Sequence, residues 1–124
     1  MYTYYVHGRK GFIMGSGKSP MLPINKVWNA TGKDGETYVV DVSVKQTTDK
    51  RKFPPDGVKS IFRVFRLNKN GEKELMILID NHEPLGFHEH DKLPDLHDSR
   101  KEICVDDWQE AWRIFEDRIK ELFS

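Results

Sequence analysis

Residues 60–67 read Ser-Ile-Phe-Arg-Val-Phe-Arg-Leu, and this stretch decides the fold. Apolar side chains occur at both odd and even positions, a pattern that is typical of a central strand. A short polar segment with Asn70-Gly71 follows, and this pair of residues favours a tight hairpin turn. The chain then returns as residues 74–79, which contain the apolar run 75–79. We therefore predict that residues 60–67 and 74–79 pair as antiparallel strands.

Two further strands are predicted before this hairpin. Residues 36–45 alternate with period two, so that Tyr38 and three valines point one way and mostly polar side chains the other. Residues 25–31 precede them across a turn that contains an Asp-Gly pair, which suits another hairpin. The tyrosine-rich segment 2–6 is a candidate for one more strand. The sequence thus predicts an antiparallel meander sheet of about four to five strands.

A C-terminal amphipathic helix completes the predicted fold. We expect Asp106 to be its N-cap, with Gln109 at the capping-box position. Apolar side chains recur at spacings of three and four and should form one stripe that packs on one face of the sheet. The stripe consists of Val105, Trp108, Trp112, Phe115, Ile119 and Leu122. The predicted fold class is α+β.

At 124 residues the chain is expected to form a single domain, 1–124. Residues 1–24 are basic and glycine-rich, and we expect a flexible N-terminal segment there, followed by a folded core at 25–124. Residues 17–19, Gly-Lys-Ser, invite comparison with a phosphate-binding loop. Phe12 stands where that motif needs glycine, however, and Pro20 would interrupt the helix that must follow. A loop of that type is therefore not expected.

The composition bears on the cellular location of the protein and on the kinds of partner that it could bind. Lysine plus arginine and aspartate plus glutamate each number 20, so the formal net charge is zero and gives no global argument for a nucleic-acid partner. The single cysteine, Cys104, cannot form an intramolecular disulfide, which favours a reducing environment. No apolar run approaches the ~20 residues that span a bilayer, and no signal peptide is recognisable. We expect a cytoplasmic protein without a membrane partner.

Histidines gather after the second strand of the central hairpin, where four of the chain's five lie between positions 82 and 97. His88 and His90 are separated by one residue, so on a strand both rings would point to the same face. Such a pair can accept and donate protons, with His82 or Asp80 orienting one ring. A metal would also suit this spacing, and its expected ligands would be His88, His90 and His82. A polar turn without a chemical role is the third alternative.

Several cations are candidates for binding phosphate. Arg63, Lys45 and Lys59 lie on or beside the strands that adjoin the histidines, where they could stabilise the charge that develops during RNA cleavage. Lys50 and Arg51 belong to the most basic part of the chain and are candidate phosphate contacts in a loop. RNA can be cleaved through its own 2′-hydroxyl, a reaction that needs proton transfer but no metal. No cofactor is therefore expected.

The arrangement as a whole resembles a known family. Its elements are the strand 62–67, the hairpin, Asp80-Asn81-His82, Gly86, His88, His90 and the C-terminal amphipathic helix. Over residues 25–123 this pattern resembles the TumE family of toxin–antitoxin systems. The resemblance implies a toxin component that a helix-turn-helix antitoxin protein neutralises.

We therefore expect a toxin that acts on RNA through a histidine-based site, with a metal-independent ribonuclease as the form that an enzyme would take. One alternative is a non-catalytic module that binds nucleic acid or protein. Another is a metal-dependent hydrolase that uses the same histidines. Whether the protein is catalytic, and whether it forms a homodimer, stays open at the level of sequence.

Overall fold

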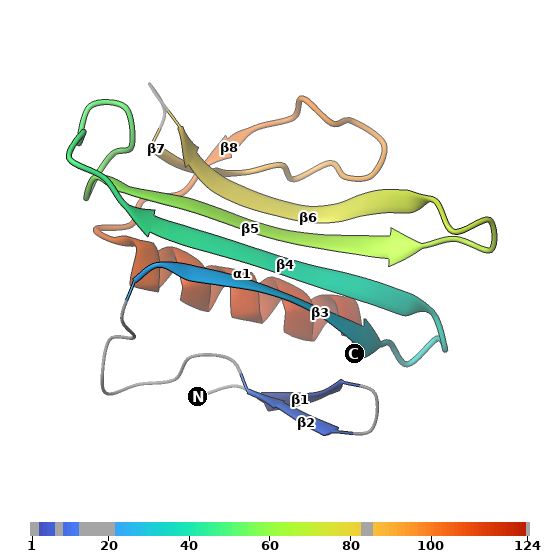
Figure 1. Ribbon diagram of the computed structural model, residues 1–124. Helices are drawn as coiled ribbons and strands as arrows, with labels where there is room; N and C mark the ends of the chain where they lie inside the picture. The colour runs from blue at the N-terminus through green and yellow to red at the C-terminus, as the bar shows by residue number, and fades with distance from the viewer. Residues whose placement is uncertain (1–2, 7–8, 13–21, 83–85, 124) are drawn as a thin grey trace.

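The computed structural model describes residues 3–6, 9–12, 22–82 and 86–123, with side chains from residue 22 onward. Its main part is a sheet of six strands with a helix on one face (Figure 1). The strands are β3 (Ile24–Thr31), β4 (Thr37–Gln46), β5 (Val58–Leu67), β6 (Lys73–His82), β7 (Gly86–Glu89) and β8 (Lys101–Glu102), and the helix is α1 (Trp108–Phe123).

The main sheet is an antiparallel meander, because each strand pairs with the next one in the chain. This confirms the predicted α+β fold with a C-terminal helix. The strand number is higher than the four to five predicted, since β7 and β8 continue the sheet beyond the histidine-rich stretch. They have four and two residues, too few for a period-two pattern to be recognised in the sequence.

The two predicted hairpin turns are present. Gly35 and Gly71 have φ angles of 79° and 78°, a backbone region that glycine enters without steric cost. Between β5 and β6 the register shifts: Val64 pairs with Ile77, whereas Phe65 pairs with Leu75. Met76 is therefore the extra residue of a β-bulge, a feature that bends a strand and increases its twist.

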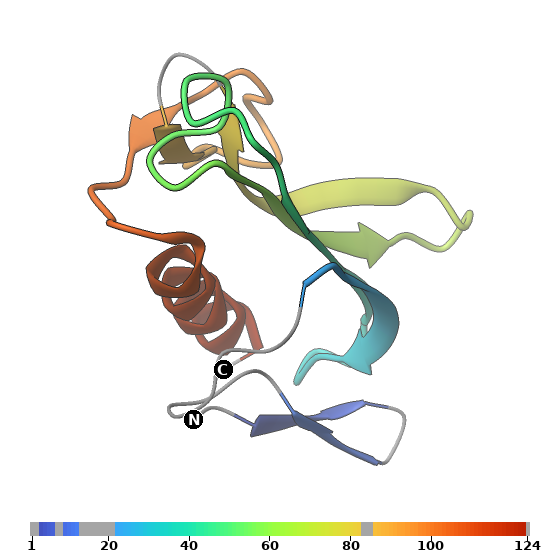
Figure 2. The ribbon, with the colours of Figure 1, turned by 60° about the vertical axis from the view of Figure 1, so that its left-hand side comes forward.

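Helix α1 covers the face of the sheet on which the core is built (Figure 2). Phe62, at the centre of β5, stacks on Phe115 with ring centroids 5.4 Å apart and meets Trp112 edge-on at 5.5 Å. Trp108 and Trp112 are buried, which agrees with the predicted packing of the apolar stripe on the sheet. No helix within the described residues is long and apolar enough to cross a membrane.

The opposite face of the sheet, which we call the open face, is formed by the alternate residues of the same strands. Ile79 points to the core and is fully buried, whereas its neighbour Asp80 is partly exposed. Across the sheet, Asp80 is in register with Ile61 of β5 and with His88 of β7. Two residues further along β5, Arg63 is in register with both Asp41 and Leu78.

The start of the helix differs from the prediction. Asp107 is the residue that caps it, because its Oδ1 accepts a hydrogen bond of 2.9 Å from the backbone N–H of Glu110. The backbone N–H of Trp108 donates to Oδ2 of Asp56, from the loop before β5, at 2.8 Å. The prediction of Asp106 as N-cap was wrong because a distant carboxylate, which local sequence patterns do not reveal, takes part in fixing where the helix begins.

The N-terminal residues form a separate element. Strands β1 (Thr3–Val6) and β2 (Arg9–Phe12) pair as a two-stranded antiparallel sheet, and β1 lies near β3 (Figures 1 and 2). The predicted aromatic strand at 2–6 therefore exists, but its partner is β2 rather than the main sheet. Much of the segment predicted to be flexible, including Gly17-Lys18-Ser19, lies outside the described residues.

Candidate functional site

Asp80, His88 and His90 meet on the open face, and we refer to these three residues as the His–Asp cluster. Asp80 of β6 lies directly opposite His88 of β7 in the antiparallel ladder. Nε2 of His88 is 2.7 Å from Oδ1 of Asp80, and the rings of His88 and His90 have centroids 5.4 Å apart. One nitrogen or oxygen from each residue lies within 4.8 Å of the others. The structure thus unites three of the four residues predicted for acid–base chemistry.

The short strand β7 places these side chains by simple alternation. Phe87 and Glu89 point toward the helix side, so His88 between them points to the open face. The strand begins at Gly86, whose φ of 67° is a backbone conformation that glycine adopts readily. A Cβ at this position would contact Pro54. Beyond the strand, the backbone N–H of His90 donates to the carbonyl of Leu78 at 3.0 Å, which continues the ladder and keeps His90 on the face of His88.

Main-chain carbonyls orient both rings. Nδ1 of His88 lies 3.0 Å from the carbonyl oxygen of Gly86, and Nδ1 of His90 lies 2.7 Å from that of His97. A carbonyl oxygen only accepts hydrogen bonds, so each Nδ1 must carry the hydrogen. In a neutral ring this leaves Nε2 with its free lone pair, and in His88 that atom faces Asp80.

The electrostatics of the cluster favour charge on His88. Contact with the Asp80 carboxylate is the main cause that raises the pKa of His88 above its ordinary value, and the Gly86 carbonyl acts in the same direction. Burial and the positive charge of Arg100 oppose the increase in pKa. The His88 side chain is only 5% exposed, against 25% for Asp80. A small ligand would therefore reach the cluster past Asp80 and the half-buried His90.

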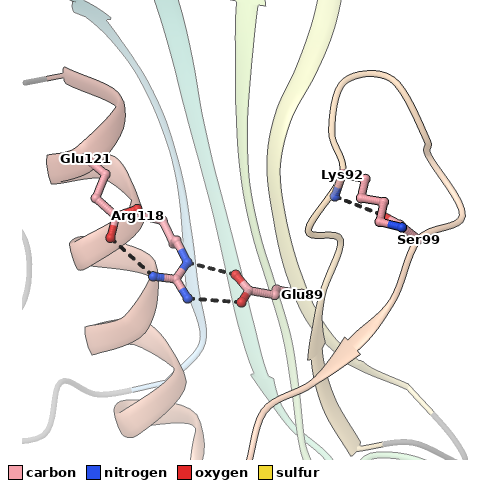
Figure 3. Close-up of polar contacts among 5 residues, drawn as sticks. All are labelled: Glu89, Lys92, Ser99, Arg118 and Glu121. Atoms are coloured by element: carbon pink, nitrogen blue, oxygen red, sulfur yellow. Dashed lines mark hydrogen bonds and ion pairs between the residues drawn. The ribbon is translucent and has the colours of Figure 1, made fainter.

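Two contacts behind the cluster hold its elements in place (Figure 3). Arg118 of α1 donates two hydrogen bonds to the buried carboxylate of Glu89, from Nε at 2.8 Å and from a terminal nitrogen at 3.0 Å. These bonds connect the helix to β7 at the residue between the two histidines. The loop that contains His97 is closed by a hydrogen bond of 3.1 Å from the backbone N–H of Lys92 to Oγ of Ser99. The loop closure supports the carbonyl that orients His90.

A hollow lies beside His90 at the edge of the sheet. Its walls include Leu78 of β6, Leu93 of the following loop, and Arg118 and Glu121 of the helix. The apolar and charged walls together could accept part of a ligand that is anchored at the cluster.

His82 does not join the cluster. It follows Asp80 by two residues on the same strand, which places it roughly 6.8 Å further along. Its ring is exposed and meets Phe53 edge-on at 5.9 Å. The third residue beside His88 and His90 is therefore Asp80 rather than His82.

The predicted phosphate-binding cations lie at different distances from the His–Asp cluster. Arg63 lies on the open face, where its guanidinium pairs with Asp41 and lies over the ring of Phe65. Lys59 is on the same face, two residues before the strand position opposite Asp80. Lys45 is exposed at the end of β4, on the far side of β5 from the cluster.

Lys50 and Arg51 occupy the exposed loop between β4 and β5. Within residues 22–82 and 86–123, no hydrogen bond or ion pair joins either residue to the cluster. Arg100, which the sequence did not single out, acts on His88 through its charge. Its position on the loop after His97 carries no pattern that could have indicated this role.

Comparison with protein-family models, with curated proteins and with solved structures found no match for this chain.

Proposed function

We propose that this protein is the toxin component of a toxin–antitoxin system and that it acts on RNA through the His–Asp cluster. The observation that carries the proposal is that Asp80, His88 and His90 present reactive atoms within 4.8 Å of one another on the open face. The toxin role and a helix-turn-helix antitoxin as partner come from the sequence pattern that resembles the TumE family, whereas the proposed cytoplasmic location comes from the composition of the chain.

The chemistry proposed is cleavage of a phosphodiester by the neighbouring 2′-hydroxyl. Nε2 of His90 accepts the proton of that hydroxyl as its oxygen attacks phosphorus, and the bond from phosphorus to the 5′-oxygen breaks. The leaving oxygen takes a proton from His88, whose pKa the contact with Asp80 raises, so that this contact favours the protonated ring. The products are a 2′,3′-cyclic phosphate and a 5′-hydroxyl.

Cations near the cluster would hold the phosphate. Arg63 and Lys59 flank the line of residues in register with Asp80 on the open face, so both could reach an RNA chain laid across β5 and β6. Arg63 would then exchange part of its contact with Asp41 for the phosphate. Lys45, Lys50 and Arg51 lie further away and fit a longer stretch of bound RNA rather than the scissile phosphate.

The test is cleavage of a defined RNA in the presence of EDTA by the full chain and by His88→Gln and His90→Ala. Loss of a proton-transfer group is expected to reduce the rate by roughly 10²–10⁴-fold. His82→Ala is the matched control, because it removes a histidine ring that lies outside the cluster. Full cleavage activity in both cluster variants would contradict the proposal. Binding of RNA without cleavage would favour a non-catalytic module.

The toxin role needs a separate test in cells. Expression of the chain alone should arrest growth, expression of His90→Ala should not, and co-expression of a helix-turn-helix protein encoded next to it should restore growth. Normal growth on expression of the soluble wild-type chain would argue against a toxin, whatever its activity on RNA.

A further inference from the structure

We propose that Asp80, His88 and His90 form a binding site for one divalent transition-metal ion of the first row, with Oδ1 of Asp80 and Nε2 of the two histidines as ligands. The proposal goes beyond the proposed function and does not depend on it, because metal binding can be measured without RNA.

The donor set and its spacing fit such an ion. Two imidazoles and one carboxylate on one side of a metal leave further coordination positions open, as in many metal-dependent enzymes. Oδ1 of Asp80 and Nε2 of His88 are 2.7 Å apart, close to the separation of about 3.0 Å between neighbouring ligands that each lie about 2.1 Å from an ion at a right angle. The longer separations, up to 4.8 Å, involve His90. Two ligands that each lie about 2.1 Å from one ion are at most about 4.2 Å apart, so binding of the ion would draw His90 slightly closer to its neighbours.

The contact between Asp80 and His88 calls for a positive charge. Because Nδ1 of His88 carries the hydrogen, Nε2 of the neutral ring and Oδ1 of Asp80 are both acceptors, and two acceptors 2.7 Å apart repel each other. Either a proton on Nε2 or a cation must lie between or beside them. Oδ1 of Asp80 is buried and lies 2.7 Å from Nε2 of His88. A divalent ion bound to both atoms would supply the positive charge that this contact needs.

The surroundings of the cluster match those of bound metals. A metal-binding histidine nearly always donates its second ring N–H to a carbonyl or carboxylate, which fixes the tautomer. Both histidines of the cluster do so, to Gly86 and to His97. The ion pair of Glu89 with Arg118 and the hydrogen bond of Lys92 with Ser99 then hold the supporting segments (Figure 3). The site is therefore pre-organised, whereas a chance grouping on a surface would lack these supports.

The same donor set indicates which ions should bind. Mg²⁺ and Ca²⁺ prefer oxygen ligands, and this site offers only one carboxylate. Thiolate ligands are absent from the cluster, so it has no special preference for copper(I). Imidazole with carboxylate suits Zn²⁺, Co²⁺, Ni²⁺ and Fe²⁺.

The test uses the full chain without an affinity tag, stripped with EDTA and titrated with Zn²⁺ by calorimetry and with Co²⁺ by visible absorption. We expect one ion per chain, no binding of Mg²⁺ at the same concentrations, and affinities lower by about 100-fold or more in Asp80→Asn and His90→Ala, which exceeds the usual effect of changing a supporting residue. Both side chains are partly exposed, so the variants should fold, which circular dichroism in EDTA checks. His82→Ala should bind as the unchanged chain does.

The proposal is overturned if the stripped chain binds no Zn²⁺ or Co²⁺, or if Asp80→Asn and His90→Ala bind as tightly as the unchanged chain. Cleavage of RNA by the same preparations bears on the proposed function instead. Cleavage that continues in EDTA upholds metal-free proton transfer even if no ion binds, and a bound ion without any cleavage upholds the metal site while the ribonuclease fails.

Discussion

The two faces of the main sheet are built from the same strands, yet they have different properties. On the face under α1, Phe62 and Ile79 are fully buried and pack into one apolar core. On the open face their chain neighbours Arg63 and Asp80 belong to ion pairs that are partly exposed. Because the pleat alternates, a single substitution alters one face while the other keeps its contacts. Stability and chemistry can therefore be tested separately in this protein.

The largest loss of stability is expected on the covered face. Phe62→Ala removes the ring that contacts Trp112 and Phe115, and it should lower the free energy of unfolding by about 3–5 kcal/mol. Phe65→Ala is the matched change on the open face of the same strand, where the ring is only half-buried, and we expect a loss of about 1–2 kcal/mol. Urea unfolding measures both values. Equal losses would mean that the two faces contribute alike to stability.

A smaller loss is expected where the helix is tied to β7. Arg118→Ala leaves the carboxylate of Glu89 buried without its partner and should lower the free energy of unfolding by about 2 kcal/mol, in the range for hydrogen bonds to charged groups. Arg113→Ala, at an exposed position of the same helix, should change it by less than about 0.5 kcal/mol. Chemical denaturation compares the two, and similar values would show that the ion pair adds nothing.

Smaller still should be the loss of stability at the cluster itself. Asp80→Asn should lower the free energy of unfolding of the metal-free protein by about 1 kcal/mol, because it removes one close charged contact. Asp41→Asn breaks the other open-face ion pair and should cost a similar amount. Only Asp80→Asn should also slow RNA cleavage and weaken metal binding. If Asp41→Asn reduced both equally, the open face rather than the cluster would be the functional unit.

The smallest effect is a dependence on pH. In metal-free protein the pKa of His88 should lie above the ordinary value of about 6.5 and should fall in Asp80→Asn, which NMR titration of the ring signals can follow. A raised pKa in the folded state means that the contact stabilises the protein fully below the unfolded value, and that this stability is lost as pH rises through the folded value. A pKa for His88 at or below 6.5 would contradict the role assigned to Asp80.

Sequence patterns predicted the parts of this fold that repeat. The alternation in residues 36–45, the Asn-Gly turn and the helical stripe each extend over enough residues to be recognised, and the corresponding strands, turn and helix are present. Strands β7 and β8 are too short for any period, so their membership in the sheet could not be foreseen. The cap at Asp107 depends partly on Asp56, which is more than fifty residues away in the chain.

The candidate site was predictable in its residue types but not in its supports. The spacing of His88 and His90 placed both rings on one face, and pairing of β6 with β7 then decided that Asp80 rather than His82 lies beside them. The carbonyls of Gly86 and His97 orient the rings through the backbone, which every residue possesses and no sequence motif marks.

The bulge at Met76 also divides the β5–β6 hairpin into two segments that should differ in how well they tolerate insertions and deletions. Deleting Met76 would bring the register on both sides into one regular ladder without turning Asp80 to the other face, whereas deleting a residue between Met76 and Asp80 would reverse the orientation of every later side chain. Natural insertions and deletions should therefore accumulate in the hairpin from its turn up to the bulge. The segment from Ile77 to Asp80 should keep a constant length.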